Sequence, residues 1–387
     1  MSVPSSTTSS DMVERGYLRA FGLSVAVWFG LFLTFTWIID PYGVSPVQLG
    51  LHRINAVKPA RVDIDRLIKP LEVWRYQPRT VLLGTSRIHQ GFDPAVLDGT
   101  SFGPAYNAAI PGASVQESAA NLEQFFRLDK NLRVVFVDLY LYSFAGSRPR
   151  PFEKSSFLET TSSLFLSAGS LLDALRTVAF NVLERPRTAH IAPGGYWVAP
   201  HSFRTSFDQQ AFLDVMMKYH HESPIMAFQS PAFAELDRIV DLCRRNDARL
   251  YLLIVPSYPW DDYRLLSMGD WPVLEQWLKR MSAYPNVISF SQYNEVLEEP
   301  PKPIMTYWND PFHFNTHMGR LMLRSILGAS DPDIPANFLR SVTSNTVDAV
   351  IHERRAGLDQ WVDRNRQFTT AFDRAKLLAG NGTPRLP

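Results

Sequence analysis

The sequence predicts an α/β fold with a central parallel sheet, preceded by one membrane-spanning helix. Short apolar runs with strand character alternate with helical patterns over most of the 387 residues. Such alternation gives a parallel sheet that helices cover on both faces. A long uncharged segment stands before this region. Hydrophobic residues make up 45% of the chain and charged residues 20%, a balance that allows a sizeable core.

The uncharged segment runs from Ala20 to Ile39. Twenty helical residues span about 30 Å, the thickness of one hydrocarbon core. Tyr17 and Trp37 stand near its two ends, where interfacial aromatic residues gather. The alternatives are a buried helix or a cleaved signal peptide. A signal peptide is disfavoured, because residues 37–41 hold no small-x-small cleavage site.

The flanking charges indicate an orientation. Arg15 and Arg19 lie close to the N-terminal side of this segment, whereas Arg53 and Lys58 stand further away on the other side. This asymmetry favours a cytoplasmic N-terminus and an extracytoplasmic body.

The later elements follow from their apolar patterns. Strands are expected at 80–84, 133–141, 249–256 and 286–290, with a further short one at 104–108. Helices are expected at 114–128, 231–246, 271–284 and 316–326. The expected divisions are a cytoplasmic segment 1–19, a transmembrane helix 20–39, a juxtamembrane linker 40–77, an α/β domain 78–335 with an insertion 145–225, and a C-terminal helical tail 336–387.

Charge and cysteine content exclude some classes. The net charge of +1 gives no support for a nucleic-acid partner. The single cysteine, Cys243, cannot form an internal disulfide and is expected to be a small core residue of a helix.

Three residues form a candidate catalytic set. Ser86 follows the strand expected at 80–84, and serines just past a strand end are where open α/β sheets present reactive groups. A serine becomes a nucleophile only when a base removes its proton. His313 could be that base, and Asp310, three residues before it, could fix its tautomer.

Other interpretations of these residues stay open. Ser86 could cap the next segment, and Asp310 with His313 could form a structural turn. His313 and His317 also have the i,i+4 spacing of a metal-binding pair. The glutamate of the HExxH pattern and a third ligand are missing, so no metal or other cofactor is expected.

Acyl transfer also needs donors for the developing oxyanion. The backbone N–H groups of Ser86 and Gly112 are candidates. Asn107 either adds a side-chain donor or pins the turn that follows the strand at 104–108.

Three short sequence segments resemble blocks of the SGNH (GDSL-like) hydrolase superfamily. Gly84-Thr85-Ser86 is similar to the first block, Gly112 to the second, and Asp310-x-x-His313 to the fifth. The resemblance covers about residues 78–328 and implies a flavodoxin-like three-layer fold. It also implies a Ser86–His313–Asp310 triad, with Gly112 as an oxyanion donor. Two positions depart from the pattern: Thr85 replaces an aspartate, and residues 139–143 replace the third block, whose asparagine is a further donor.

The anchor, followed by Asp40-Pro41-Tyr42-Gly43 and then Gly-Thr-Ser-Arg, looks like the membrane-tethered branch of this superfamily. Its relatives assist the O-acetylation of bacterial polysaccharides or the D-alanylation of teichoic acid. The resemblance therefore implies a serine O-acyltransferase or carbohydrate esterase in the bacterial inner membrane, with a periplasmic domain. Its expected partners are a cell-envelope polysaccharide or its acyl donor, the lipid bilayer through residues 20–39, and a multi-pass membrane acyltransferase. The rival expectation is a non-catalytic glycan-binding or scaffold protein.

Overall fold

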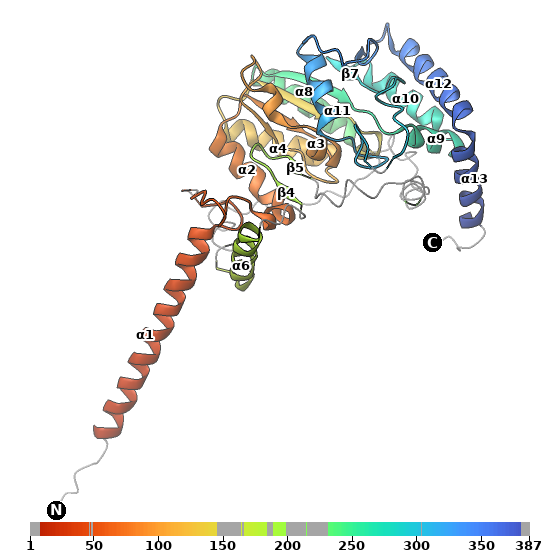
Figure 1. The fold of residues 1–387 in the computed structure, drawn as a ribbon. Coiled ribbons are helices and arrows are strands. Elements are labelled where there is room, and N and C mark those ends of the chain that lie inside the picture. The colour runs from red at the N-terminus through yellow and green to blue at the C-terminus, as the bar shows by residue number, and fades with distance from the viewer. Residues whose placement is uncertain are drawn as a thin grey trace, which may run out of the picture. The chain divides into compact units, whose positions relative to one another are not determined.

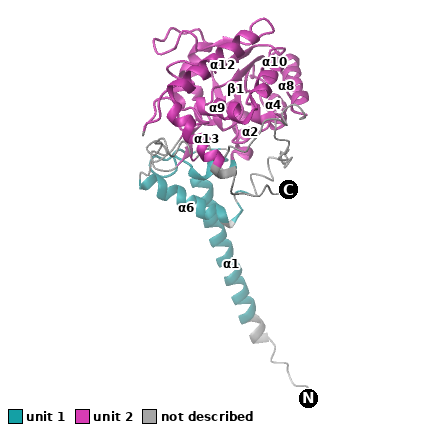
Figure 2. Ribbon diagram, turned by 90° about the vertical axis from the view of Figure 1, so that its right-hand side faces the viewer, with its two compact units in different colours: residues 1–64, 154–185 teal, residues 65–153, 186–387 magenta. Residues whose placement is uncertain are grey.

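The computed structural model divides the chain into two compact units, coloured separately in Figure 2. Unit 1 comprises Met1–Ile64 and Lys154–Arg185, and unit 2 comprises Asp65–Glu153 and Pro186–Pro387. The structure describes residues 8–45, 47, 49–144, 164, 166–183, 189–198, 214, 231–302 and 304–380.

Unit 1 contains the expected N-terminal apolar helix. Helix α1 (Thr8–Ile39) is followed by the 3₁₀ helix η1 (Pro59–Ile64), and helix α6 (Ala168–Val182) packs against α1. The stretch Val13–Ile39 is long and apolar enough to cross a membrane, and only 11% of its most apolar window is buried. The helix begins earlier than the expected boundary at residue 20, because the polar residues before it also adopt helical geometry.

Unit 2 contains a six-stranded sheet, visible in Figure 1. The strands lie in the order β2-β1-β3-β6-β7-β8, and all neighbours are parallel except β7 and β8. The five parallel strands thus have the flavodoxin-like order 2-1-3-4-5, which confirms the expected fold class. The strands are β1 (Thr80–Leu83), β2 (Ala105–Asn107), β3 (Val134–Asp138), β6 (Arg249–Ile254), β7 (Val287–Ser289) and β8 (Arg340–Ser341).

Helices cover both faces of this sheet, since every residue of β1 and β3 is buried. Each strand of this kind is a continuous apolar run, which is why the sequence shows it clearly. The helices of unit 2 are α2 (Asp65–Tyr76), α3 (Ser86–Gly91), α4 (Val115–Leu128), α8 (Ala232–Arg245), α9 (Pro259–Met268), α10 (Trp271–Met281), α11 (Thr316–Ile326), α12 (Val347–Arg364) and α13 (Arg366–Gly380), with 3₁₀ turns η2 (Pro94–Leu97) and η3 (Leu141–Phe144).

Two expected divisions are corrected. The segment 40–77 is not a linker throughout, because α2 contacts α4 and belongs to unit 2. The segment 336–387 is not a separate tail. Its first strand extends the sheet antiparallel to β7, and Arg354 of α12 forms a buried ion pair with Asp262 of α9. A buried charge pair leaves no apolar pattern in the sequence, which explains the error.

The expected insertion 145–225 is shared between the two units. Helix α6 lies in unit 1, whereas the hairpin of β4 (His190–Ile191) and β5 (Trp197–Val198) lies in unit 2. The part of this insertion after Val198 lies outside the described residues, apart from Asp214.

Candidate catalytic site at the carboxyl edge of the sheet

Ser86 stands where the sequence places it, just past the carboxyl end of β1. It is the first residue of α3, and the Oγ atom lies 2.7 Å from Nε2 of His313, 227 residues further along the chain. At 2.7 Å the hydroxyl and the imidazole are within hydrogen-bond distance. The serine and the histidine are partly exposed, so a substrate can reach them.

Asp310 completes the arrangement on the far side of the imidazole. Its Oδ2 and Oδ1 atoms lie 2.7 and 2.9 Å from Nδ1 of His313. The carboxylate also accepts the backbone N–H groups of Phe312, at 2.8 Å, and of His313, at 2.9 Å. Two backbone donors fix the position of this carboxylate. It can therefore hold the imidazole in the tautomer that carries its proton on Nδ1, which leaves Nε2 free to accept the serine proton.

A close crossing of α3 and α11 brings these residues together. A Cβ atom on Gly319 of α11 would stand 1.8 Å from the carbonyl oxygen of Gly91 in α3, so only glycine fits there. A Cβ on Gly91 would likewise lie 2.0 Å from the ring of Phe314. Since His313 closely precedes α11 and Ser86 begins α3, this backbone contact sets the distance between them.

The turn before Ser86 is held by Asp138, the last residue of β3. The Thr85 hydroxyl donates to its carboxylate at 2.9 Å, and the Arg87 guanidinium lies 4.0 Å away. Burial raises the pKa of the Asp138 carboxyl, and the Arg87 charge opposes that shift. Gly84 has φ +151°, and a Cβ there would lie 2.5 Å from the Asp138 side chain.

Asp138 was not predicted from the sequence, although an acidic residue at the end of an otherwise apolar strand is a visible signal. Arg87 is also a structural residue. It is buried, donates to the Val255 carbonyl at 2.5 Å, and stacks over the ring of Tyr140 at 4.4 Å. Asp138, Thr85 and Arg87 therefore hold the turn that positions Ser86.

Asn107 is corrected from a possible oxyanion donor to a residue that pins the turn. Its Nδ2 atom donates to the carbonyls of Ile88 and Phe92, both at 2.8 Å, and its Oδ1 atom accepts from Ala109. Both amide protons are thus used, and the side chain is fully buried. Of the two roles that the sequence left open, the structure selects the structural one.

The two backbone donors stay available as candidates. The Ser86 N–H lies in the first turn of α3, where N–H groups have no intrahelical partner. Gly112 is exposed with φ +66°, and its N–H makes no hydrogen bond to any residue that the structure describes. Its role in an oxyanion hole stays a prediction.

The residues in place of the third block are engaged elsewhere. The Tyr142 hydroxyl accepts from Arg264 at 2.5 Å, and the Ser143 hydroxyl donates to the Tyr140 carbonyl at 2.6 Å. The Tyr140 ring lies under Arg87. Of these contacts, only that of Ser143 uses a hydroxyl proton, so this side chain is not directed at an oxyanion.

The β4–β5 hairpin adjoins the site. Strand β5 contacts α3, and the carbonyl of Gly194 in the hairpin turn accepts the Asn107 N–H at 2.7 Å. The buried Lys69 ammonium donates to the carbonyls of Asn107 and Gly195, both at 2.8 Å. Trp197 thus belongs to a strand that contacts the serine helix.

A second histidine–carboxylate pair joins α3 to α2. Nε2 of His89 stands 2.9 Å from Oδ2 of Asp65, and both side chains are buried. Burial, reinforced by the Lys69 charge, lowers the pKa of His89 to about 4. His89 is therefore neutral near pH 7 and serves the packing of α2 against α3.

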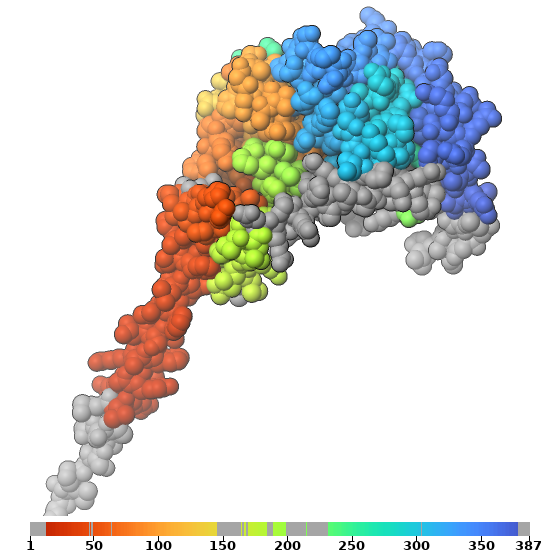
Figure 3. All heavy atoms as spheres, viewed as in Figure 1, coloured from red at the N-terminus to blue at the C-terminus, as the bar shows by residue number. Residues whose placement is uncertain are grey.

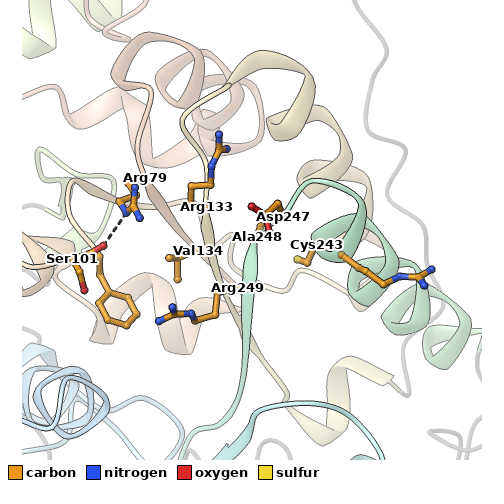
Figure 4. A pocket seen from close by; sticks show the side chains of 10 residues that line it. Arg79, Ser101, Arg133, Val134, Cys243, Asp247, Ala248 and Arg249 are labelled. Atoms are coloured by element: carbon orange, nitrogen blue, oxygen red, sulfur yellow. Dashed lines mark hydrogen bonds between the residues drawn. The ribbon is translucent and has the colours of Figure 1, made fainter.

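A cavity of about 530 Å³ lies at the opposite edge of the sheet (Figure 4). Its lining includes Arg79, Arg133 and Arg249, which precede or open β1, β3 and β6 at their amino ends. Cys243 also lines it, and burial raises the pKa of that thiol to about 12, so it is a core residue as expected. This cavity is separate from the Ser86 site.

No protein-family model matches the chain, and no curated protein matches it. Function is therefore inferred from the geometry of the site itself.

Proposed function

We propose that this protein is a membrane-anchored serine acyltransferase or esterase that acts on O-acyl groups, acetyl above all, of a cell-envelope polysaccharide. The observation that supports it is the chain of contacts from Ser86 Oγ to His313 Nε2 and from His313 Nδ1 to Asp310, each 2.7 Å. This order of hydroxyl, imidazole and carboxylate is what converts an inert serine into a nucleophile.

The mechanism follows from the contacts. His313 Nε2 takes the Ser86 proton as Oγ attacks the acyl carbonyl carbon. The resulting imidazolium is stabilised by Asp310 and gives its proton to the leaving alcohol, which leaves an acyl ester on Ser86. A second alcohol, or water, then attacks that ester while His313 acts again as the base. Ser86 is thereby regenerated, and the acyl group moves to the acceptor.

The oxyanion hole favours transfer over plain hydrolysis. Loss of one donor typically costs about 2.7–4 kcal/mol of transition-state stabilisation, and Tyr142 and Ser143 direct their hydroxyls elsewhere. Contacts to a bound acceptor, remote from the reacting atoms, can compensate for this loss. The hairpin beside α3, with Trp197, is the candidate acceptor surface.

The proposed location is the bacterial inner membrane, with the α/β unit in the periplasm. The support is the apolar stretch Val13–Ile39 together with Arg15 and Arg19 near its N-terminal side. A multi-pass membrane acyltransferase would be a suitable source of acyl groups. A reporter that works only outside the cytoplasm should be active when it is fused after Pro387. Activity of a reporter that works only in the cytoplasm would contradict this placement.

The activity test compares consumption of a soluble acetyl ester with and without candidate oligosaccharides, and follows acetylated glycan by mass spectrometry. We expect weak hydrolysis, a marked increase with an acceptor, and no turnover by Ser86→Ala. Fast hydrolysis that no acceptor changes would indicate a plain esterase.

A second candidate function is a non-catalytic glycan-binding or scaffold protein of an envelope modification system. The hydrogen bond from Ser143 to the Tyr140 carbonyl favours it, because that hydroxyl then gives no donor to an oxyanion. A Ser86→Ala variant that still supports polysaccharide modification in cells would favour this candidate over the enzyme.

A further inference from the structure

Helix α6 has an inverted distribution of side chains. The face that is buried consists of small and polar residues, whereas the leucines are exposed: Ala174 and Thr177 have no exposed surface, but Leu172 and Leu175 are 57% and 51% exposed. A surface helix in water shows the opposite arrangement, with its apolar stripe against the core. The buried set is Ser170, Ala174, Thr177 and Asn181, and the exposed set is Leu171, Leu172, Leu175 and Val182.

The buried face packs within unit 1, beside the end of α1 (Figures 1 and 3). Tyr42, just after α1, donates its hydroxyl to Asp173 at 2.8 Å. Asn181 pairs with the Val57 backbone in both directions, at 2.9 and 2.7 Å. Small residues one turn apart let two helices approach closely, which is the packing that membrane helices use where lipid offers no hydrophobic driving force.

The part of α1 that is buried lies inside the expected span. Of residues 13–39, only Thr36 and Ile39 are buried. Both fall near the end of the segment 20–39, at the depth of the leaflet next to the following loop. Because α6 packs against α1, its exposed leucines belong to the same unit as the exposed apolar residues of α1 that would contact lipid.

We propose that α6 is a second membrane-contacting element, whose leucine face enters the leaflet at the C-terminal end of α1. The leucine face would contact the boundary between the hydrocarbon core and the headgroups of the bilayer. The 15 residues of α6 reach about 22 Å, so it enters one leaflet and does not cross.

The charges on α6 fit this position. The Arg176 guanidinium lies 3.2 Å from Asp173, and its side chain is exposed next to the leucines. A long arginine side chain can extend along apolar surface and place its charge at the headgroups. The loop between α1 and η1 adds apolar surface to the same unit through the exposed residues Leu49, Leu51 and Ile54. This inference rests on membrane insertion of α1 and is independent of the chemistry at Ser86.

The test uses the full chain with Cys243→Ser, reconstituted in phosphatidylethanolamine–phosphatidylglycerol vesicles. Single nitroxide labels are introduced through Leu172→Cys, Leu175→Cys and, as a water-facing control, Arg244→Cys. Collision rates with oxygen, which concentrates in lipid, and with a water-soluble nickel chelate report the surroundings of each label. Helical content and elution in detergent verify folding.

The labels at 172 and 175 should collide with oxygen several-fold more often than with nickel, and the label at 244 should show the reverse. Nickel collision at 172 and 175 as frequent as at 244 would place the leucines in water and overturn the proposal. Exclusion of both reagents from 172 and 175 in these vesicles would also overturn it, because protein rather than lipid would then cover the face.

Discussion

Gly319 and Gly91 meet backbone to backbone, since a Cβ on Gly319 would stand 1.8 Å from the Gly91 carbonyl oxygen. The two glycines belong to α11 and α3, the helices that closely follow His313 and begin at Ser86. Their contact therefore fixes the spacing of the candidate catalytic residues from outside the site.

Gly319→Ala should weaken both the fold and the site. Overpacking typically costs about 1–3 kcal/mol, and here the obstacle is backbone, which cannot rotate away. We expect a lower melting temperature and lower turnover of an acetyl ester. Gly22→Ala in α1, where an added Cβ meets nothing within 4 Å, is the matched control. A Gly319→Ala protein with unchanged stability would contradict the described contact.

Asp310→Asn should leave the fold intact and reduce kcat about 10⁴-fold, as the same change of the orienting carboxylate does in triads. The amide can donate to Nδ1 of His313 and so favours the tautomer in which Nε2 faces the serine with its proton. Steady-state kinetics should show the loss in kcat, with KM little changed. Asp331→Asn, on the loop after α11, removes a carboxylate that pairs with Arg320 and Arg324 and should retain full activity.

Thr85→Val tests the hydrogen bond between Thr85 and Asp138, which holds the turn before Ser86. The valine keeps the shape of the side chain but removes the donor to the buried Asp138 carboxylate and the N-cap acceptor of the Arg87 N–H. An unsatisfied buried acceptor costs about 1–3 kcal/mol, which urea unfolding should detect. Thr85→Ser retains the hydroxyl and should remain close to the parent stability. Equal stability of all three proteins would show that the Thr85–Asp138 hydrogen bond contributes nothing.

Acid should destabilise the α/β unit through His89. Its pKa is about 4 in the folded state, against 6.5 for an unperturbed histidine. Between these values the unfolded chain binds the proton and the folded chain does not, so stability falls as pH drops from about 6.5 to 4. The loss amounts to roughly 3 kcal/mol and levels off below pH 4.

Unfolding free energies measured across that pH range provide the test. His89→Gln, which cannot be protonated, should show a flatter profile over this window. His352→Gln, at an exposed histidine of α12, should keep the parent slope. An identical slope in His89→Gln and the parent would remove His89 as the cause.

The sequence predicted the parts of this molecule whose signal is local. Buried parallel strands such as β1 and β3 are continuous apolar runs, and helix α11 has the bounds 316–326 that its periodicity predicts. Ser86, His313 and Asp310 were found because their order matches a known pattern.

Features that depend on distant partners could not be predicted. The tail joins unit 2 through the Arg354–Asp262 pair with α9 and through a two-residue strand that extends the sheet, and neither has a sequence signature. The role of Asn107 depended on which carbonyls its amide would reach. Helix α6 has an apolar pattern like that of a core helix, and only the structure shows that its leucines face outward.

The most direct test of the central claim is covalent labelling of the full-length protein in membranes with a fluorophosphonate probe, followed by mapping of the adduct by mass spectrometry. A serine activated by His313 should carry the adduct at Ser86. Labelling should disappear in Ser86→Ala, become much slower in His313→Ala, and persist in Ser143→Ala, whose hydroxyl only donates to the Tyr140 carbonyl. An unlabelled parent protein, or an adduct that remains in Ser86→Ala, would contradict the proposed nucleophile.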